Sequence, residues 1–144
     1  SILFTYQPDE EQLYVNKAIE LYKDKAVFID ISKLFVNFIQ KDGWDSFEKY
    51  YRDFQNTPHV IFRSDDPDMD LFDMVIDEIE ASANKGKIPF LVRTGCLHGT
   101  GIENVNIMEH KSILKLEYPL VIFYPSRTED DNLFFLNFYC IWGN

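Results

Sequence analysis

The sequence predicts an α/β fold with a mixed β-sheet, in a single domain spanning residues 1–144. Three short runs of β-branched and aromatic residues lack the alternation of a half-exposed strand, and segments of helical length separate them. These runs are residues 26–31, 59–62 and 88–92. Continuous apolar runs of this kind are typical of strands buried on both faces of a parallel or mixed sheet. They predict a β-α-β-α-β core flanked by helices.

The segment between the second and third runs predicts a helix over 67–84. Its apolar residues recur at steps of three and four, which places them on one helical face. They are Met69, Phe72, Ile76, Ile79 and Ala83. We expect this face to lie on the sheet.

The N-terminal part predicts a strand and further helices. Residues 2–6 read as a first strand, and Pro8 followed by three acids predicts a helix over 8–23. Gly43 divides the segment 32–55 into two short helices. The second of these has an aromatic face, which we expect to be core because such faces are more often buried than free for binding. It consists of Phe47, Tyr50, Tyr51 and Phe54.

The C-terminal third predicts an antiparallel extension of the sheet. Residues 94–112 are rich in glycine and polar residues and read as a loop with a short strand at 105–108. Three strands are then expected, at 113–118, 119–126 and 132–142, and the charged segment 127–131 connects the last two as a hairpin.

Charge and composition exclude several classes of protein. Fourteen Lys and Arg against twenty-four Asp and Glu give a net charge of −10, which repels nucleic acid and anionic lipid and favours a basic partner. No apolar run approaches the length of a membrane span. The two cysteines, Cys96 and Cys140, form no CxxC pattern, so a reducing, cytoplasmic location is expected.

Acidic side chains are the first candidates for a binding site. The segment 65–80 contains eight acids and no Lys or Arg, and the hairpin connection adds three more. A solvated helix face explains such a segment as well as a partner surface does. The candidate contacts are Asp66, Asp70, Asp73, Asp77, Glu129, Asp130 and Asp131.

Candidate chemistry is sparse. Cys96 and His98 follow the third apolar run, where ligand-binding loops of open α/β sheets lie, and are the candidates for a nucleophile and a base. The glycines around them lead into no clear helix and therefore lack the phosphate-binding fingerprint. Cysteine and histidine lack the paired spacing of a zinc site. We expect no catalysis, no cofactor and no metal.

The order of segments over 25–93 resembles the barstar family of ribonuclease-toxin inhibitors. The local match is Trp44-Asp45-Ser46-Phe47, which is similar to the segment that opens that family's nuclease-binding helix. The resemblance implies that Asp45 faces the toxin. The family's second acid corresponds here to Lys49, and the neighbouring Glu48 is its expected substitute.

These observations predict a non-catalytic immunity protein that blocks a basic nuclease-type toxin with carboxylates. Two alternatives stay open. One is a subunit or adaptor of a larger assembly, which would use the aromatic strand containing Phe134, Phe138 and Trp142. The other is an enzyme that depends on Cys96 and His98.

Overall fold

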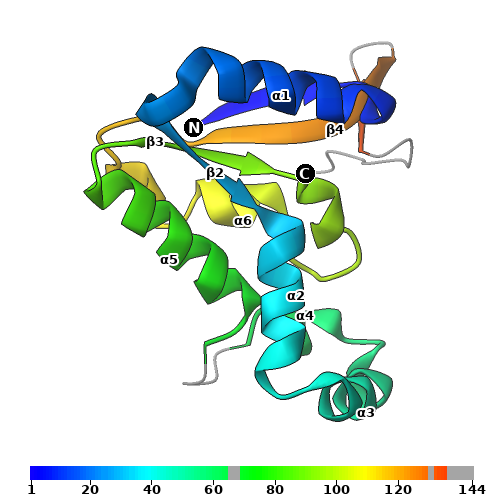
Figure 1. Cartoon of the computed structure of the whole chain (residues 1–144). Coiled ribbons are helices and arrows are strands. Elements are labelled where there is room, and N and C mark those ends of the chain that lie inside the picture. Colours follow the sequence, from blue (N-terminus) through cyan, green and yellow to red (C-terminus); the bar gives the residue numbers. More distant parts are fainter. Residues whose placement is uncertain (65–68, 130–131, 136–144) are drawn as a thin grey trace.

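A four-stranded parallel β-sheet forms the centre of the molecule (Figure 1). The computed structural model describes residues 1–64, 69–129 and 132–135, with the backbone alone for 127–129 and 132–135. Along the sheet the order is β1-β4-β3-β2. These strands are β1 (Ile2–Tyr6), β4 (Val121–Glu129), β3 (Ile88–Val92) and β2 (Ala26–Asp30).

Helices cover both faces of the sheet. On one face lies α1 (Glu11–Tyr22), whose Val15 and Ala18 pack with Phe90 and Phe123. The other face is covered by α2 (Ile31–Lys41), α5 (Leu71–Asn84) and α6 (Asn104–Met108). Leu91 points to this second face, as expected for a strand in which successive side chains alternate between faces. The result is a three-layer arrangement with two separate apolar cores.

Two helices lie away from the sheet, between α2 and α5 in the chain. They are α3 (Trp44–Phe54) and α4 (Pro58–Phe62). Figure 1 places α3 at the opposite end of the molecule from α1. Short 3-10 turns complete the described structure, at Pro8–Glu10, Lys23–Lys25, Thr94–Leu97 and Ile113–Lys115.

The predicted strand at 59–62 is wrong, because this segment is the helix α4. Pro58 occupies the first helical turn, where its missing N–H costs nothing. Ile61 and Phe62 are buried in the core of the second face. An apolar run of four residues fits a buried helical turn as well as a buried strand. The β-α-β-α-β core therefore lacks its middle strand, and β2 pairs directly with β3.

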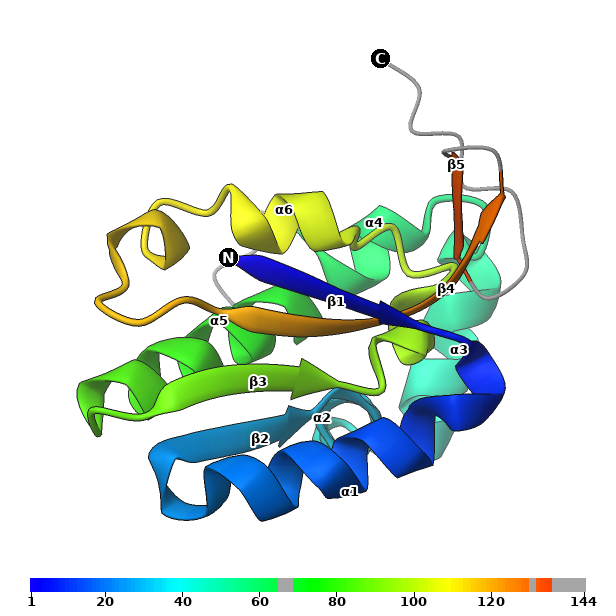
Figure 2. The same cartoon turned by 90° about the horizontal axis from the view of Figure 1, so that it is seen from above.

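The prediction of a mixed sheet is also wrong. All four strands of the sheet are parallel, and β4 lies inside the sheet, between β1 and β3. Its antiparallel partner β5 (Asn132–Phe135) pairs with it only from Ser126 onward. That pairing begins where the register with β1 ends, so it forms a hairpin that turns away from the sheet (Figure 2).

Two further strand predictions fail nearby. Residues 105–108 lie in the helix α6, where the side chains of Glu103 and Asn106 form a reciprocal capping box. Residues 113–118 contain a 3-10 turn and no strand. The predicted strand over 132–142 is described only as far as Phe135, and its remainder lies outside the described residues.

The coarse prediction of an α/β fold is confirmed. The strands at 2–6, 26–30 and 88–92 are present, and the predicted helices at 8–23 and 67–84 correspond to α1 and α5. Among the described residues, no helix has the length and apolar character that crossing a membrane requires.

Truncating Ile79 tests the core of the second face. Its side chain is fully buried in α5, so Ile79→Ala is expected to lower the free energy of unfolding by about 2–5 kcal/mol. Leu114, which is 72% exposed, is the control. Leu114→Ala should change the free energy of unfolding by less than about 0.5 kcal/mol. Urea denaturation measures both. Equal effects of the two substitutions would contradict this packing.

Candidate functional site

The helix α3 exposes a group of aromatic side chains, which we call the α3 aromatic surface. None of the eleven residues of α3 is buried. The expectation that this face is core is therefore wrong for most of it, and only Phe47 is half-buried. The surface consists of Trp44, Tyr50, Tyr51 and Phe54, which are 60%, 42%, 41% and 37% exposed.

The half-buried Phe47 attaches α3 to the rest of the molecule. Its ring centroid lies 6.1 Å from that of Phe38 in α2 and 6.1 Å from that of Phe62 in α4. Gly43, with a φ of 83°, lets the chain reverse between α2 and α3, a conformation that other residues rarely adopt. The helix therefore packs on the rest of the molecule through Phe47, and the flanking aromatic rings remain exposed.

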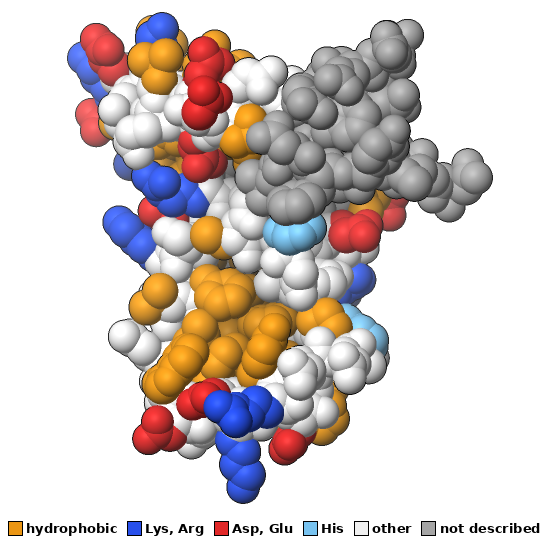
Figure 3. Space-filling view, turned by 90° about the vertical axis from the view of Figure 1, so that its right-hand side faces the viewer, with side chains coloured by type: hydrophobic (Ala, Val, Ile, Leu, Met, Phe, Trp, Pro, Cys, Tyr) orange, Lys and Arg blue, Asp and Glu red, His pale blue; other side chains and the backbone are white. Residues whose placement is uncertain are grey.

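Figure 3 shows the face of the molecule that contains this region. Hydrophobic side chains gather there over α2, α3 and α4, and the surface between them is hollowed. Charged side chains border the hollow at the lower rim. Large apolar patches bordered by polar groups mark interaction sites more often than chance exposure does.

The acids predicted as partner contacts are spread over several elements. Asp45 is exposed in the first turn of α3, and Glu48 forms an ion pair of 2.6 Å with Arg52 on the same helix. Asp73 and Asp77 are exposed on α5. Glu129 ends β4, where only its backbone is described, and three other predicted acids lie outside the described residues. Those three are Asp66, Asp130 and Asp131.

Asp70 has a structural role that the sequence did not suggest. It is the N-cap of α5, its side chain accepts a hydrogen bond of 2.8 Å from the backbone N–H of Asp73, and it is buried. Burial raises the pKa of its carboxyl group above the ordinary value. A buried capping carboxylate is poorly placed to contact a partner.

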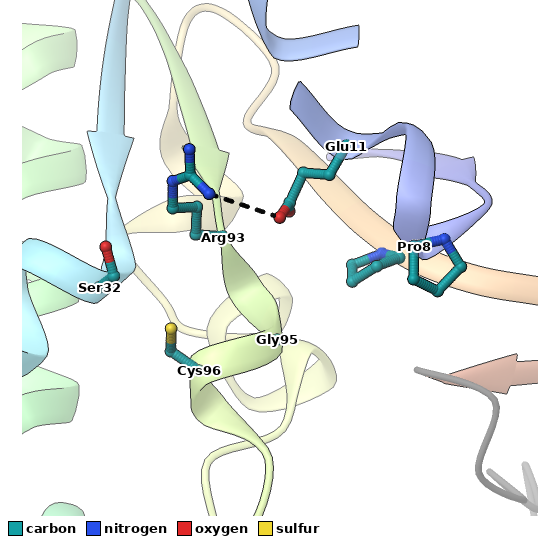
Figure 4. A pocket seen from close by; sticks show the side chains of 7 residues that line it. Pro8, Glu11, Ser32, Arg93, Gly95 and Cys96 are labelled. Atoms are coloured by element: carbon teal, nitrogen blue, oxygen red, sulfur yellow. Dashed lines mark ion pairs between the residues drawn. The ribbon is translucent and has the colours of Figure 1, made fainter. Parts of the chain in front are cut away.

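A cleft of about 420 Å³ opens at the carboxyl ends of the parallel strands. Ligands of open α/β sheets bind at this edge. Figure 4 shows Ser32 and Cys96 on one side of the cleft and Pro8 and Glu11 on the other. The lining residues are Pro8, Glu11, Ser32, Arg93, Gly95, Cys96 and Pro125.

Arg93 is the centre of the polar network in this cleft. Its Nη2 donates a hydrogen bond of 2.6 Å to Gln12 Oε1. Its Nε lies 3.6 Å from Asp30 Oδ2, and its Nη1 lies 3.9 Å from Glu11 Oε2. Arg93 has a φ of 58°, an uncommon left-handed conformation for a residue other than glycine. Arg93 follows β3 directly and precedes the 3-10 turn Thr94–Leu97, which contributes Gly95 and Cys96 to the lining of the cleft.

The carboxylates of the network have fixed positions. Glu11 Oε1 accepts a hydrogen bond of 2.6 Å from the Tyr6 hydroxyl, and Asp30 Oδ1 accepts from the backbone N–H of Ser32 at 2.9 Å. Burial, followed by the hydrogen bond to Glu11, raises the pKa of Tyr6 far above its ordinary value, so its hydroxyl stays protonated and keeps donating. Sequence reasoning missed Glu11, Asp30 and Arg93 as a group.

The cleft contains one of the two residues proposed for catalysis. Cys96 lines it with an exposed free thiol, whereas His98 is not among the lining residues. Partial burial in the cleft, and then the negative charges of Asp30 and Glu11, raise the pKa of the Cys96 thiol. A thiol that is protonated at neutral pH is a weak nucleophile.

Alkylation of Cys96 tests this electrostatic environment. In a Cys140→Ser background, Asp30→Asn removes a negative charge and can keep the cap of α2, so the pKa of Cys96 should fall. Iodoacetamide should then react several-fold faster at pH 8, because the gain in thiolate outweighs the loss of intrinsic nucleophilicity. Arg93→Gln should slow the reaction, since Arg93 lowers that pKa. Changes of the same sign in both variants would contradict the network.

Two substitutions of Asp70 test its role as a cap. Asp70→Ala should cost about 0.5–2 kcal/mol of unfolding free energy, whereas Asp70→Asn keeps an acceptor for the Asp73 N–H. A raised folded-state pKa means that ionisation of Asp70 opposes folding as pH rises. The unfolding free energy of the Asn variant should therefore equal or exceed that of wild type at pH 7. Below pH of about 4, where Asp70 is protonated, the two should be alike. Chemical denaturation at both pH values measures this, and an Asn variant as unstable as the Ala variant would refute it.

A scan against protein-family models found no match, and neither did searches of curated proteins and of solved structures. The resemblance to the barstar family therefore depends on residues 25–93 of this sequence alone. Its local motif, Trp44-Asp45-Ser46-Phe47, forms the first turn of α3.

Proposed function

We propose that the protein is an immunity protein, which binds a basic nuclease-type toxin through α3 and blocks it without catalysis. The observation that carries the proposal is that α3 buries none of its residues although one of its faces is aromatic. A helix with an apolar face normally gains its stability by burying that face. An aromatic face left in solvent is available to a partner.

The chemistry of this surface suits protein recognition. Tryptophan and tyrosine are enriched among the residues that contribute most to binding energy, because they supply large contact areas and a polar group at the edge. Trp44 is the most exposed of the four rings, at 60%. The hollowed apolar region visible in Figure 3 can receive an apolar side chain of the partner.

Carboxylates beside the rings specify a basic partner. Asp45 and Glu48 lie next to Trp44 in the first turns of α3. Charge-assisted hydrogen bonds from lysine or arginine to carboxylates are about twice as strong as neutral ones. Lys49 and Arg52 on the same helix keep its local charge modest, so α3 supplies specific contacts more than a strong field.

The long-range field comes from the whole chain and from α5. The net charge of −10 attracts a basic domain, and the exposed Asp73 and Asp77 contribute to this field from outside the α3 aromatic surface. Such a field raises the association rate more than the affinity, and salt screens it. A nuclease active site, which holds phosphates with basic residues, is the complementary surface.

Co-purification from the native host, followed by identification of the bound protein, provides the partner for the test. The proposal requires a basic domain with nuclease activity that the purified chain inhibits stoichiometrically. A bound protein without nuclease activity, or a nuclease whose activity is unchanged by the chain, would refute the toxin-inhibitor assignment.

Substitutions on α3 distinguish direct contacts, which set the dissociation rate, from long-range electrostatic attraction, which sets the association rate. Trp44→Ala should weaken binding to that nuclease by about 2 kcal/mol or more, mainly through faster dissociation. Asp45→Asn should reduce the association rate and its dependence on salt. Asp77→Asn on α5 is the matched control for loss of one carboxylate and should leave dissociation unchanged. Surface plasmon resonance at two salt concentrations measures the rates, and a Trp44→Ala variant with wild-type dissociation would exclude α3 as the contact.

A further inference from the structure

We propose that the cleft at the carboxyl ends of the strands binds a small neutral molecule that presents a carbonyl oxygen beside an N–H group, as a primary carboxamide or a lactam does. This site is separate from the α3 aromatic surface: its lining residues come from the starts of α1 and α2, from β4 and from the segment after β3. None of the lining residues belongs to α3.

The position and size of the cleft suit a small ligand. Its volume of about 420 Å³ falls within the range of small-molecule sites, about 300–1,000 Å³. Pro8 and Pro125 provide rigid apolar walls, and Gly95 adds no side chain that would fill the space. The polar groups, from Glu11, Arg93 and Ser32, are few. A site with apolar walls and a few polar groups orients a ligand by those groups.

Glu11 and Arg93 present an acceptor and a donor with unused hydrogen-bonding capacity. Glu11 Oε2 and Arg93 Nη1 lie 3.9 Å apart, which is too long for a hydrogen bond between them. Among the described residues, the hydrogen bonds of these two side chains are made through other atoms, Glu11 Oε1 and Arg93 Nη2. Glu11 Oε2 and Arg93 Nη1 form an ion pair at this distance, and neither atom makes a hydrogen bond to another described residue.

The spacing of this pair matches an amide edge. In a primary amide the oxygen and nitrogen lie about 2.3 Å apart, given C=O and C–N bonds of about 1.23 and 1.33 Å. Two hydrogen bonds of about 2.9 Å from these atoms reach a donor and an acceptor 3.9 Å apart with only a slight divergence. The ligand carbonyl accepts from Arg93 Nη1, and its N–H donates to Glu11 Oε2.

The surrounding network holds this pair in place. The Tyr6 hydroxyl fixes Glu11 through Oε1, and Gln12 fixes Arg93 through Nη2. Asp30 lies on the other side of the guanidinium, at Nε, so Nη1 is the nitrogen that faces Glu11. Because two carboxylates, Glu11 and Asp30, flank the single guanidinium of Arg93 and the chain carries a charge of −10, an anionic ligand is disfavoured.

Benzamide is the probe for this site, and ¹H–¹⁵N NMR titration of the full chain is the measurement. We expect saturable shifts of the backbone amide signals of Ser32, Gly95 and Cys96. N,N-dimethylbenzamide lacks the N–H donor and benzoate replaces it with a charged oxygen, so both should bind at least about tenfold more weakly. Benzamide without saturable shifts, or binding of either analogue as tight as that of benzamide, would overturn the proposal.

Two variants locate the hydrogen bonds. Glu11→Gln leaves one acceptor oxygen in place of the two that serve the Tyr6 hydroxyl and the ligand N–H, and Arg93→Lys keeps the charge but removes Nη1. Both should weaken benzamide binding about tenfold or more. Glu78→Gln, which removes an exposed carboxylate of α5 outside the cleft, is the control and should bind as wild type does. A Glu11→Gln variant with wild-type affinity would refute the assignment, and the analogue comparison on wild type decides it even if a variant does not fold.

Discussion

A parallel sheet has to be covered on both faces, and this constraint determines how the rest of the chain is used. The central strands β3 and β4 are buried along almost their whole described length, which is possible only between two helical layers. The helix α1 supplies one layer, and α2, α5 and α6 supply the other. With both faces covered, α3 has no sheet left to pack on. Its exposure is a consequence of the topology and not of its own sequence.

The strands and helices that the sequence predicted correctly are those with strong local patterns. The run at 88–92 is apolar throughout because β3 is central, and α5 has regular three- and four-residue spacing. The run at 59–62 is too short for its pattern to separate a strand from a helical turn, and only Pro58 indicates the helix. The position of β4 inside a parallel sheet depends on pairing with β1 and β3, which local sequence does not encode.

The candidate sites also depend on contacts between distant segments, which local sequence patterns do not reveal. The aromatic face of α3 has the pattern of a core helix, and nothing within the helix reveals that its neighbours leave it in solvent. The polar network of the cleft includes the hydrogen bond between Arg93 and Gln12, which are 81 residues apart, so no motif spacing identifies it. One signal was present: Asp30 and Arg93 are charged residues at the ends of two apolar runs, and the carboxyl ends of parallel strands meet at one edge. Asp70 was misleading because acids near a helix start serve both capping and surface charge.

The pairing of β1 has a consequence for how the chain acquires its structure during synthesis. Within the described residues β1 pairs only with β4, and Ile2 lies opposite Val121. The ribosome therefore makes β1 long before its partner exists, while β2 and β3 can already associate. Closing so distant a contact is slow, because chain entropy is lost before the contact forms. Until then Phe4 and its neighbours have no strand beside them, and a nascent chain in this state is a natural substrate for chaperones that shield apolar segments.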